Sequence, residues 1–373
     1  MIKTLKYFLI ISFLLSWQAC QNQKSAKDDG LTGPGNWALL PFTRIDSVNP
    51  VLLTSNVLSF MDPILEQPVK WEEKDVFNPA AIVRDGKVYL LYRAEDKIGI
   101  YQGTSRIGLA VSNDGMHFTK NPEPVFFPAK DSMKAYEWPG GCEDPRVVIS
   151  EEGLYIMTYT AYEGKTARLC IAVSEDLMKW EKKGLAFGKA YQGKFKDTWS
   201  KSGSIICRRD GENFIAVKIG GKYQMYWGDT DIFLAHSNDL LSWEPLVDAE
   251  GNLKPVLKPR QGFFDSDLIE PGPPAMMTDQ GILLIYNSRN KAGTGDPEIP
   301  DGTYSAGQAL FNKTDPSLVK ERLEKNFFMP EKEYEISGQV NQVCFLEGLV
   351  YFQEKYFLYY GTADSKIAVA VKK

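Results

Sequence analysis

The stretch AVSEDLMKW (172–180) is one of three similar segments, the others being AVSNDGMHF (110–118) and AHSNDLLSW (235–243). The serines at the third position are 62 and 63 residues apart. A fixed period of this size indicates a repeated supersecondary unit. Each copy is typical of a strand end, an Asp-containing turn and an aromatic residue that packs back onto the sheet.

A hairpin pattern extends the repeat over the chain: a polar cluster leads into apolar residues, a Gly-centred turn and a Tyr-rich strand. Five segments have it: 77–94, 142–161, 201–219, 270–288 and 341–364. The chain contains 12% aromatic residues, and blocks of helix-favouring residues are scarce, a balance that favours strands. Repeated small sheets around a channel form a β-propeller. We therefore predict an all-β, five-bladed β-propeller over residues 46–373, with a central active-site pocket.

The N-terminal residues have a different character. Lys3 and Lys6 precede the apolar run FLIISFLLSW (8–17), and Cys20 follows a small residue. This pattern is typical of a bacterial signal peptide with a lipobox-like cysteine, and the run is short for a membrane span. We expect a signal peptide at 1–20, a tether at 21–45 and a lipid anchor at Cys20 as the sole membrane attachment. The expected location is that of an exported periplasmic or cell-surface lipoprotein of a Gram-negative bacterium. The alternative is ordinary cleavage, with Cys20 incidental.

Charge and cysteine usage restrict the classes of partner. The formal net charge of −5 gives no general attraction for nucleic acid. The remaining cysteines are widely spaced, without a C-x-x-C pair, and the chain has two histidines. Buried free thiols are therefore favoured over disulfides, no metal site is predicted and no cofactor is expected. These cysteines are Cys142, Cys170, Cys207 and Cys344.

The segment WPGGCEDPRVV (138–148) places Glu143 and Asp144 side by side before an apolar strand. Taken alone, an Asp-Pro would be a solvated turn. In a propeller, however, the innermost strand of each blade starts next to the axis, so the five polar clusters should converge. The predicted ring contains Asn78, Glu143, Asp144, Lys201, Glu270, Asn341 and Gln342, with Arg93, Arg106, Arg146, Asp229 and Asp364 as neighbours.

Carboxylates, amides and aromatic rings in one pocket suit a sugar, because polar groups bind its hydroxyls and rings cover its apolar face. Two carboxylates on opposite sides can hydrolyse a glycosidic bond, one as acid and one by activating water. The alternative, favoured for Arg146, is that charged residues form ion pairs between blades. The candidate aromatic residues are Trp138, Tyr159, Trp199, Tyr226 and Trp227.

The motifs FNPAAI, YRA, SRIGLAVSNDG, EDPRV, YTAY, GPP and YYGTAD, from about residue 77 to the C-terminus, resemble glycoside hydrolase family 130. This family contains mannoside phosphorylases and mannosidases on a five-bladed propeller. The resemblance implies inverting action on terminal β-mannosides. It also implies that Asp144 is the proton donor, acting through a mannose hydroxyl. The sugar would be held by Asn78, Arg93, Lys201 and Asp364, and we add Arg106 and Tyr159 as expected sugar contacts.

Three segments depart from the pattern of the phosphorylases, which carry cationic phosphate-binding residues there: MYWGD (225–229), IEPGPP (269–274) and YNSR (286–289). Asp229 and Glu270 lie in two of them. A carboxylate can deprotonate water and repels a phosphate dianion. We therefore predict an exo-acting inverting glycosidase that hydrolyses terminal β-1,2- or β-1,4-mannosides, with Glu270 as base and Asp229 as its alternative or partner.

Three alternatives stay open at this point. Because Arg289 could contact phosphate, the enzyme could be a phosphorylase that uses inorganic phosphate as co-substrate and releases mannose 1-phosphate. A propeller pocket could also bind a glycan without cleaving it, which would make the chain a non-catalytic glycan-binding lipoprotein. A glycosidase for arabinosides or fructosides would be expected to have an aspartate where this chain has Asn78.

Overall fold

The computed structural model describes residues 37–101 and 103–373. The expected signal peptide, Cys20 and most of the expected tether lie outside the described residues. Within the described part, helix is confined to α1 (Lys134–Glu137), α2 (Glu333–Ile336) and the 3₁₀ turn η2 (Ala190–Gly193). None of these helices is long and apolar enough to cross a membrane. The predicted all-β class is confirmed.

The antiparallel strands of the described chain form five successive groups. The first two groups are β4 (Asp75–Arg84), β5 (Lys87–Glu95), β6 (Ser105–Ser112) and β7 (Thr119–Lys120), then β8 (Gly141–Ile149), β9 (Tyr155–Tyr162), β10 (Ala167–Ser174) and β11 (Glu181–Leu185). The third is β12 (Ser204–Ile205), β15 (Lys218–Ile219), β16 (Lys222–Trp227), β17 (Ile232–Ser237), β18 (Trp243–Pro245) and β19 (Pro255–Leu257).

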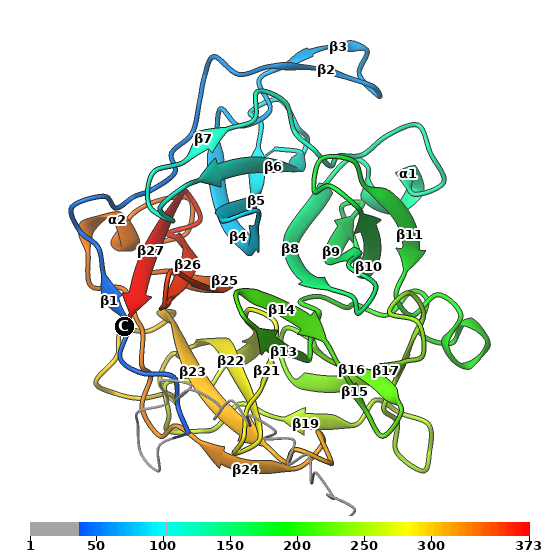
Figure 1. Ribbon diagram of the computed structural model, residues 1–373, viewed down its shortest axis with the longest axis vertical. Coiled ribbons are helices and arrows are strands. Elements are labelled where there is room, and N and C mark those ends of the chain that lie inside the picture. The colour runs from blue at the N-terminus through cyan, green and yellow to red at the C-terminus, as the bar shows by residue number, and fades with distance from the viewer. Residues whose placement is uncertain (1–36, 102) are drawn as a thin grey trace, which may run out of the picture.

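The fourth and fifth groups complete the circuit around the common centre visible in Figure 1. They are β20 (Leu268–Pro271), β21 (Met276–Met277), β22 (Ile282–Arg289), β23 (Tyr304–Phe311) and β24 (Val319–Arg322), then β25 (Cys344–Phe352), β26 (Lys355–Thr362), β27 (Lys366–Lys372) and β1 (Thr43–Arg44). A separate hairpin comprises β2 (Phe60–Asp62) and β3 (Gln67–Val69).

Short parallel contacts join neighbouring groups. Ser105 of β6 pairs with Gly141 of β8. The small hairpin of β13 (Cys207–Asp210) and β14 (Asn213–Ala216) contacts β8 through β14 and β21 through β13. Through these contacts the first, second and fourth groups and the β13–β14 hairpin form one hydrogen-bonded sheet.

The N-terminal part of the described chain belongs to the folded domain. Thr43 and Arg44 of β1 pair with β27, the last strand of the chain. Trp37, Ala38 and Leu39 are buried, and the Leu39 N–H donates to Gln308 Oε1 at 2.8 Å. Residues 37–45, which the sequence analysis assigned to the tether, therefore pack on the fourth and fifth groups, and burial of their apolar side chains stabilises this arrangement.

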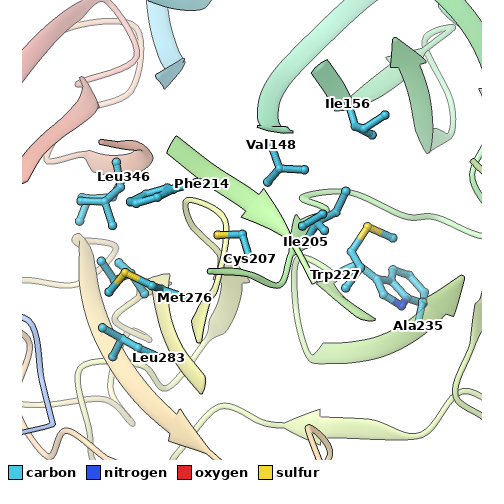
Figure 2. Packing of buried hydrophobic residues seen from close by; sticks show 14 of the residues in the cluster. Val148, Ile156, Ile205, Cys207, Phe214, Trp227, Ala235, Met276, Leu283 and Leu346 are labelled. Atoms are coloured by element: carbon cyan, nitrogen blue, oxygen red, sulfur yellow. The ribbon is translucent and has the colours of Figure 1, made fainter. Parts of the chain in front are cut away.

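Apolar side chains fill the space between adjacent sheets. Strand β8 is buried along its whole length, because a neighbouring sheet covers each of its faces. Figure 2 shows the largest such cluster, where Val148, Phe214, Met276 and Leu346 from different groups meet. The four cysteines named above are buried and free, as predicted.

The repeated Ser-x-Asp turn is held by the same hydrogen bonds in all three copies. In the third copy, Ser237 Oγ accepts from the Leu240 N–H at 2.9 Å, and Asp239 Oδ1 accepts from the N–H groups of Leu241 and Ser242 at 2.9 Å. Trp243 Nε1 then donates to the Leu240 carbonyl at 3.1 Å. The serines and aspartates of the repeat are thus turn-forming residues.

Replacing Asp239 by Ala should lower the free energy of unfolding by about 1–2 kcal/mol, because two backbone donors lose their acceptor. Backbone hydrogen bonds lower the pKa of Asp239 against the effect of burial. Its ionised form therefore stabilises the folded state above about pH 4, and this contribution is lost as the pH falls. Urea unfolding at pH 7 measures the loss. Asp279→Ala is the matched control, since its side chain is 84% exposed; an equal loss in both variants would contradict the assignment.

Candidate active site

A small pocket lies where the openings of the groups converge. Its volume is about 150 Å³, well below the ~300–1,000 Å³ of pockets that enclose a drug-sized ligand. It therefore suits a single sugar ring. The lining residues are Phe77, Asn78, Arg93, Asp144, Lys201, Glu270, Tyr304, Val340, Val343, Phe345 and Asp364.

Backbone bulges place the key side chains in this pocket. Asn78 and Asp144 have positive φ values of 47° and 48°, and the register of each strand with its hairpin partner shifts at the same point. Such bulges re-aim a side chain, and strained φ values of this kind concentrate at functional sites. Ser202, at the opening of the third group, has the same left-handed conformation, with φ 56°.

Asp144 accepts hydrogen bonds from both neighbouring side chains of the first group. Its Oδ1 lies 3.0 Å from Asn78 Nδ2 and 3.2 Å from Arg93 Nη1, while its Oδ2 lies 3.5 Å from Lys201 Nζ. Burial disfavours the charged carboxylate, but the charges of Arg93 and Lys201 outweigh it and hold the pKa of Asp144 well below its usual range. Asp144 is therefore ionised at neutral pH.

The pKa values of two neighbouring carboxyl groups, those of Glu143 and Asp364, are raised instead. Burial raises the pKa of Glu143 to about 7, against the opposing charge of Arg93, whose Nη2 is 3.0 Å from Glu143 Oε1. Burial likewise raises the pKa of Asp364 to about 7. Glu143 and Asp364 are therefore partly protonated near pH 7.

Glu270 and Asp229 also lie near Lys201: burial lowers the pKa of Lys201, but the charges of Glu270 and Asp144, followed by Glu143 and Asp229, raise it overall. Ser202 Oγ donates a hydrogen bond to Glu270 Oε1. Burial raises the pKa of Glu270, Lys201 lowers it and Asp229 raises it further. Asp229 does not line the pocket, but its Oδ2 accepts from Trp199 Nε1 at 2.6 Å. Lys201 thus contacts Asp144, and its chain neighbour Ser202 contacts Glu270.

The side-chain amide of Asn78 has one buried acceptor that no described residue uses. Its Nδ2 is used by Asp144, and its Oδ1 is buried without a hydrogen-bond partner among the described residues. A buried acceptor in this state costs free energy until a donor reaches it. A sugar hydroxyl would be such a donor.

Arg146 is a structural residue beneath the pocket, as the sequence interpretation favoured. Its guanidinium donates to the carbonyls of Asp144 at 3.1 Å, Pro271 at 2.8 Å and Gly272 at 2.8 Å. It also lies 3.1 Å from Glu347 Oε1 of β25. One buried cation therefore fixes the second, fourth and fifth groups relative to one another.

Two of the residues predicted to contact the sugar, Arg106 and Tyr159, do not line this pocket. Arg106 is fully buried between Asp62 and Asp96, with both N–O distances 2.6 Å. It pairs with Ala94, whereas Arg93 pairs with Ile107; because successive residues of a strand face opposite sides, Arg106 points away from the Arg93 face.

Tyr159 is likewise buried outside the pocket. Its hydroxyl donates to Glu137 at 2.8 Å, and its ring packs edge-on against Phe126. Among the other aromatic candidates, Tyr226 and Trp227 are also buried. The aromatic content of the chain thus serves mainly the packing between sheets.

Several lining residues were not predicted. Tyr304, Val343 and Phe345 come from the fourth and fifth groups and form an apolar wall. Phe77 supports Arg93, whose guanidinium lies 4.7 Å from the centre of the ring. Tyr304, Val343 and Phe345 lie in none of the motifs quoted above, whereas Phe77 is the first residue of FNPAAI.

Larger hollows lie elsewhere on the surface. One of about 590 Å³ is lined by Trp180, Leu241 and the turn of Asp176, and one of about 660 Å³ by Trp37, Phe42 and Phe327. The Asp176 carboxylate is used within its own turn. The smaller central pocket is the candidate site because charged side chains converge on it, although the two surface hollows have larger volumes.

Comparisons with known proteins show the family of the chain. A family model described as β-1,4-mannooligosaccharide phosphorylase matches residues 45–373. The chain belongs to glycoside hydrolase family 130. The resemblance inferred from the motifs is thereby confirmed, and the chain is a member of a family of enzymes.

A curated relative in family 130 is the 1,2-β-oligomannan phosphorylase of Thermoanaerobacter sp. It is 32% identical over 311 residues, which cover 81% of this chain and 91% of the relative. The β-1,2-mannobiose phosphorylase of the same organism is 31% identical over 325 residues and covers 83% of this chain and 94% of its own length.

Solved structures of the family are more similar. A glycosyl hydrolase from Bacteroides ovatus is 46% identical, with a TM-score of 0.89, over 92% of this chain and 96% of the other. A structure with 47% identity and the same TM-score and coverage comes from work stating that family 130 "of mannoside phosphorylases contains glycoside hydrolases that target beta-1,2 mannosidic linkages in Candida mannan".

The raised pKa of Asp364 predicts a pH-dependent stability. In the unfolded chain an aspartate has a pKa of about 3.9, so between that value and about 7 the folded state keeps a proton that the unfolded state has lost. The free energy of unfolding should therefore fall as the pH rises from about 5 to about 7. In Asp364→Asn this fall should be smaller by about 1–2 kcal/mol. Urea unfolding at the two pH values tests it; an unchanged slope, or the same change in the Asp279→Asn control, would contradict the assignment.

Proposed function

We propose that the protein is an exo-acting, inverting β-mannosidase that hydrolyses terminal β-mannosides, with the β-1,2 linkage preferred over β-1,4. The observation that carries this proposal is the placement of Glu270 in the same pocket as Asp144, with Ser202 donating a hydrogen bond to Glu270 and Lys201 beside Asp144. The 47% identity to a structure from work on β-1,2-mannoside hydrolases of the family supports the reaction and the linkage.

The charges of the pocket favour water over phosphate as nucleophile. Lys201 contacts Asp144, and Arg93 contacts Glu95, Glu143 and Asp144. A phosphate dianion would have to compete with these carboxylates for the two cations that line the pocket, and would be repelled by Glu270.

Arg289, the residue that kept the phosphorylase alternative open, is paired with an acid. Its Nε lies 2.6 Å from Asp267 Oδ2, and its Nη1 lies 3.4 Å from the Tyr304 hydroxyl. The neighbouring acid reduces its attraction for phosphate. Curated relatives of the chain are nevertheless phosphorylases, so the nucleophile is the feature to test first.

In the proposed reaction, Glu270 removes a proton from a water molecule as the water oxygen attacks the anomeric carbon of the terminal mannose. The bond from that carbon to the glycosidic oxygen breaks, and the leaving oxygen receives a proton from Asp144 relayed by a hydroxyl of the same mannose. Free mannose and a shortened saccharide result, with inverted configuration at the anomeric carbon. Burial of Glu270 supports its role, because a raised pKa makes a carboxylate a stronger base.

Because its pKa is low, Asp144 must gain a proton before it can act as the acid, so its pKa has to rise when the substrate binds. A sugar hydroxyl that takes the hydrogen bonds of Asn78 and Arg93 would weaken their hold on the charged carboxylate and raise its pKa. Glu143 and Asp364 are then the neighbouring proton sources for Asp144, since each has a pKa of about 7. In this proposal, substrate binding thus leads to protonation of Asp144, the general acid.

We further infer that the five antiparallel groups are the blades of a β-propeller. The repeat period, the arrangement of the groups around one centre and the pairing of β1 with β27 support this inference. Export as a lipoprotein through the segment 1–20 remains a proposal from the sequence, and a free mannose product would suit a compartment outside the cell's phosphate pool.

The nucleophile can be tested by product analysis with β-1,2-mannobiose, in the presence and absence of inorganic phosphate. Because the proposed nucleophile is water, mannose should be released at the same rate in both reactions. Asp144→Asn should keep affinity for the sugar and lose turnover, which separates an enzyme from a glycan-binding protein. Mannose 1-phosphate formed only with phosphate would establish a phosphorylase and remove the assignment of the base.

The base can be tested by comparing Glu270→Gln with Asp229→Asn. Loss of the base should lower kcat by about 10²–10⁴, so the larger loss is expected for Glu270→Gln. In Asp229→Asn a like charge that raises the pKa of Glu270 is removed, so the acidic limb of kcat/KM should move to lower pH. Azide, which needs no base, should restore turnover to Glu270→Ala. The reverse order of losses would identify Asp229 as the base.

A further inference from the structure

Three aromatic side chains form a row at the rim between the first, second and third groups. The ring centres of Tyr101 and Tyr162 are 6.1 Å apart, with an angle of 57° between the rings. Those of Tyr162 and Trp199 are 6.5 Å apart, with an angle of 70°. We call these three residues the aromatic row.

The aromatic row begins beside the pocket. Trp199 precedes the pocket residue Lys201 by two positions, and its Nε1 donates to Asp229. Tyr162 pairs with Gly141, two positions before Glu143. Burial and then the charge of Glu143 raise the pKa of the Tyr162 hydroxyl. Tyr162 therefore lies close enough to the site to interact with its charges.

The row is exposed, although its rings are held in place. Trp199 is 48% exposed and Tyr101 46% exposed. Gly164 has φ +106°, and a Cβ atom there would overlap the Tyr101 ring; a Cβ at Gly140 would overlap the ring of Tyr162. Exposed aromatic surface near a binding pocket favours a binding role, and rings fixed before binding lose little entropy.

We propose that the aromatic row binds the leaving part of a β-linked manno-oligosaccharide, one sugar face against each ring, so that the enzyme selects chains over disaccharides. This inference rests on the proposed function. The pocket volume of about 150 Å³ leaves room for the terminal sugar, so every further unit of a chain must lie outside it. The row is the aromatic surface that the rim offers to those units.

The tilt between the rings fits this ligand class. Linkage through adjacent ring positions turns each sugar against the next, so the faces of a 1,2-linked chain point in different directions. Rings at 57° and 70° to each other can meet such faces, whereas a flat, extended chain would require a more nearly parallel set.

The test compares β-1,2-mannotetraose with β-1,2-mannobiose as substrates. For the wild type, kcat/KM should be higher for the tetraose. In Tyr101→Ala and in Trp199→Ala the ratio of the two values should fall by about two- to tenfold per ring. Trp199→Phe should keep most of the ratio, because phenylalanine also presents an aromatic ring. The variant cannot donate a hydrogen bond to Asp229, so it tests the ring separately from that hydrogen bond.

Tyr191→Ala is the matched control. Tyr191 is 43% exposed and also contacts a neighbouring ring, Phe195, but lies on the separate η2 turn. The control should leave the ratio unchanged. An unchanged ratio in the Tyr101 and Trp199 variants would overturn the proposal. So would light scattering that gives a dimer for the wild type and a monomer for Tyr101→Ala, because the row would then be a contact between copies of the chain.

Calorimetry with Asp144→Asn separates this inference from the proposed function. If the wild type turns over neither saccharide but Asp144→Asn binds the tetraose more tightly through Tyr101 and Trp199, the row is confirmed and the activity is wrong. If turnover occurs and binding of the tetraose does not depend on the two rings, the activity stands and the row is overturned.

Discussion

The buried guanidinium of Arg146 is the contact on which the rest of the site depends. It binds the carbonyls of Asp144, Pro271 and Gly272 and lies beside Glu347. A buried cation without such partners would be strongly destabilising, and the partners would otherwise be carbonyls without donors. The groups that carry Asp144 and Glu270 are therefore held in a fixed relation, and two carboxylates can act on one bond only when that relation is kept.

The charges above Arg146 are distributed unequally. Asp144 takes the hydrogen bonds of Asn78 and Arg93 and stays ionised, while Glu143 and Asp364 hold protons up to about pH 7. Groups of one type thus have different roles because their partners differ. A sugar hydroxyl that enters this network competes for the same donors, so binding and proton supply are linked in the proposed mechanism.

The geometry of the site requires unfavourable backbone conformations. Asn78, Asp144 and Ser202 adopt a left-handed conformation that is unfavourable for most residues. Each lies at the opening of a group, where a strand bulge or turn directs its side chain to the centre. The same residues would be ordinary strand residues in a regular ladder. The strained positions are also the functional ones, as expected when strain is maintained by surrounding contacts.

The sequence by itself determined the all-β class, the repeat and the family, because strand alternation, Asp turns and contiguous motifs such as EDPR are local. It also identified Asn78, Arg93, Asp144, Lys201, Glu270 and Asp364, which the structure brings together in one pocket. Only the tertiary structure decided that Arg106 and Tyr159 are buried elsewhere and that Trp37 belongs to the domain. The face of a strand on which a side chain lies depends on register, and the partner of an N-terminal segment depends on contacts across the whole chain.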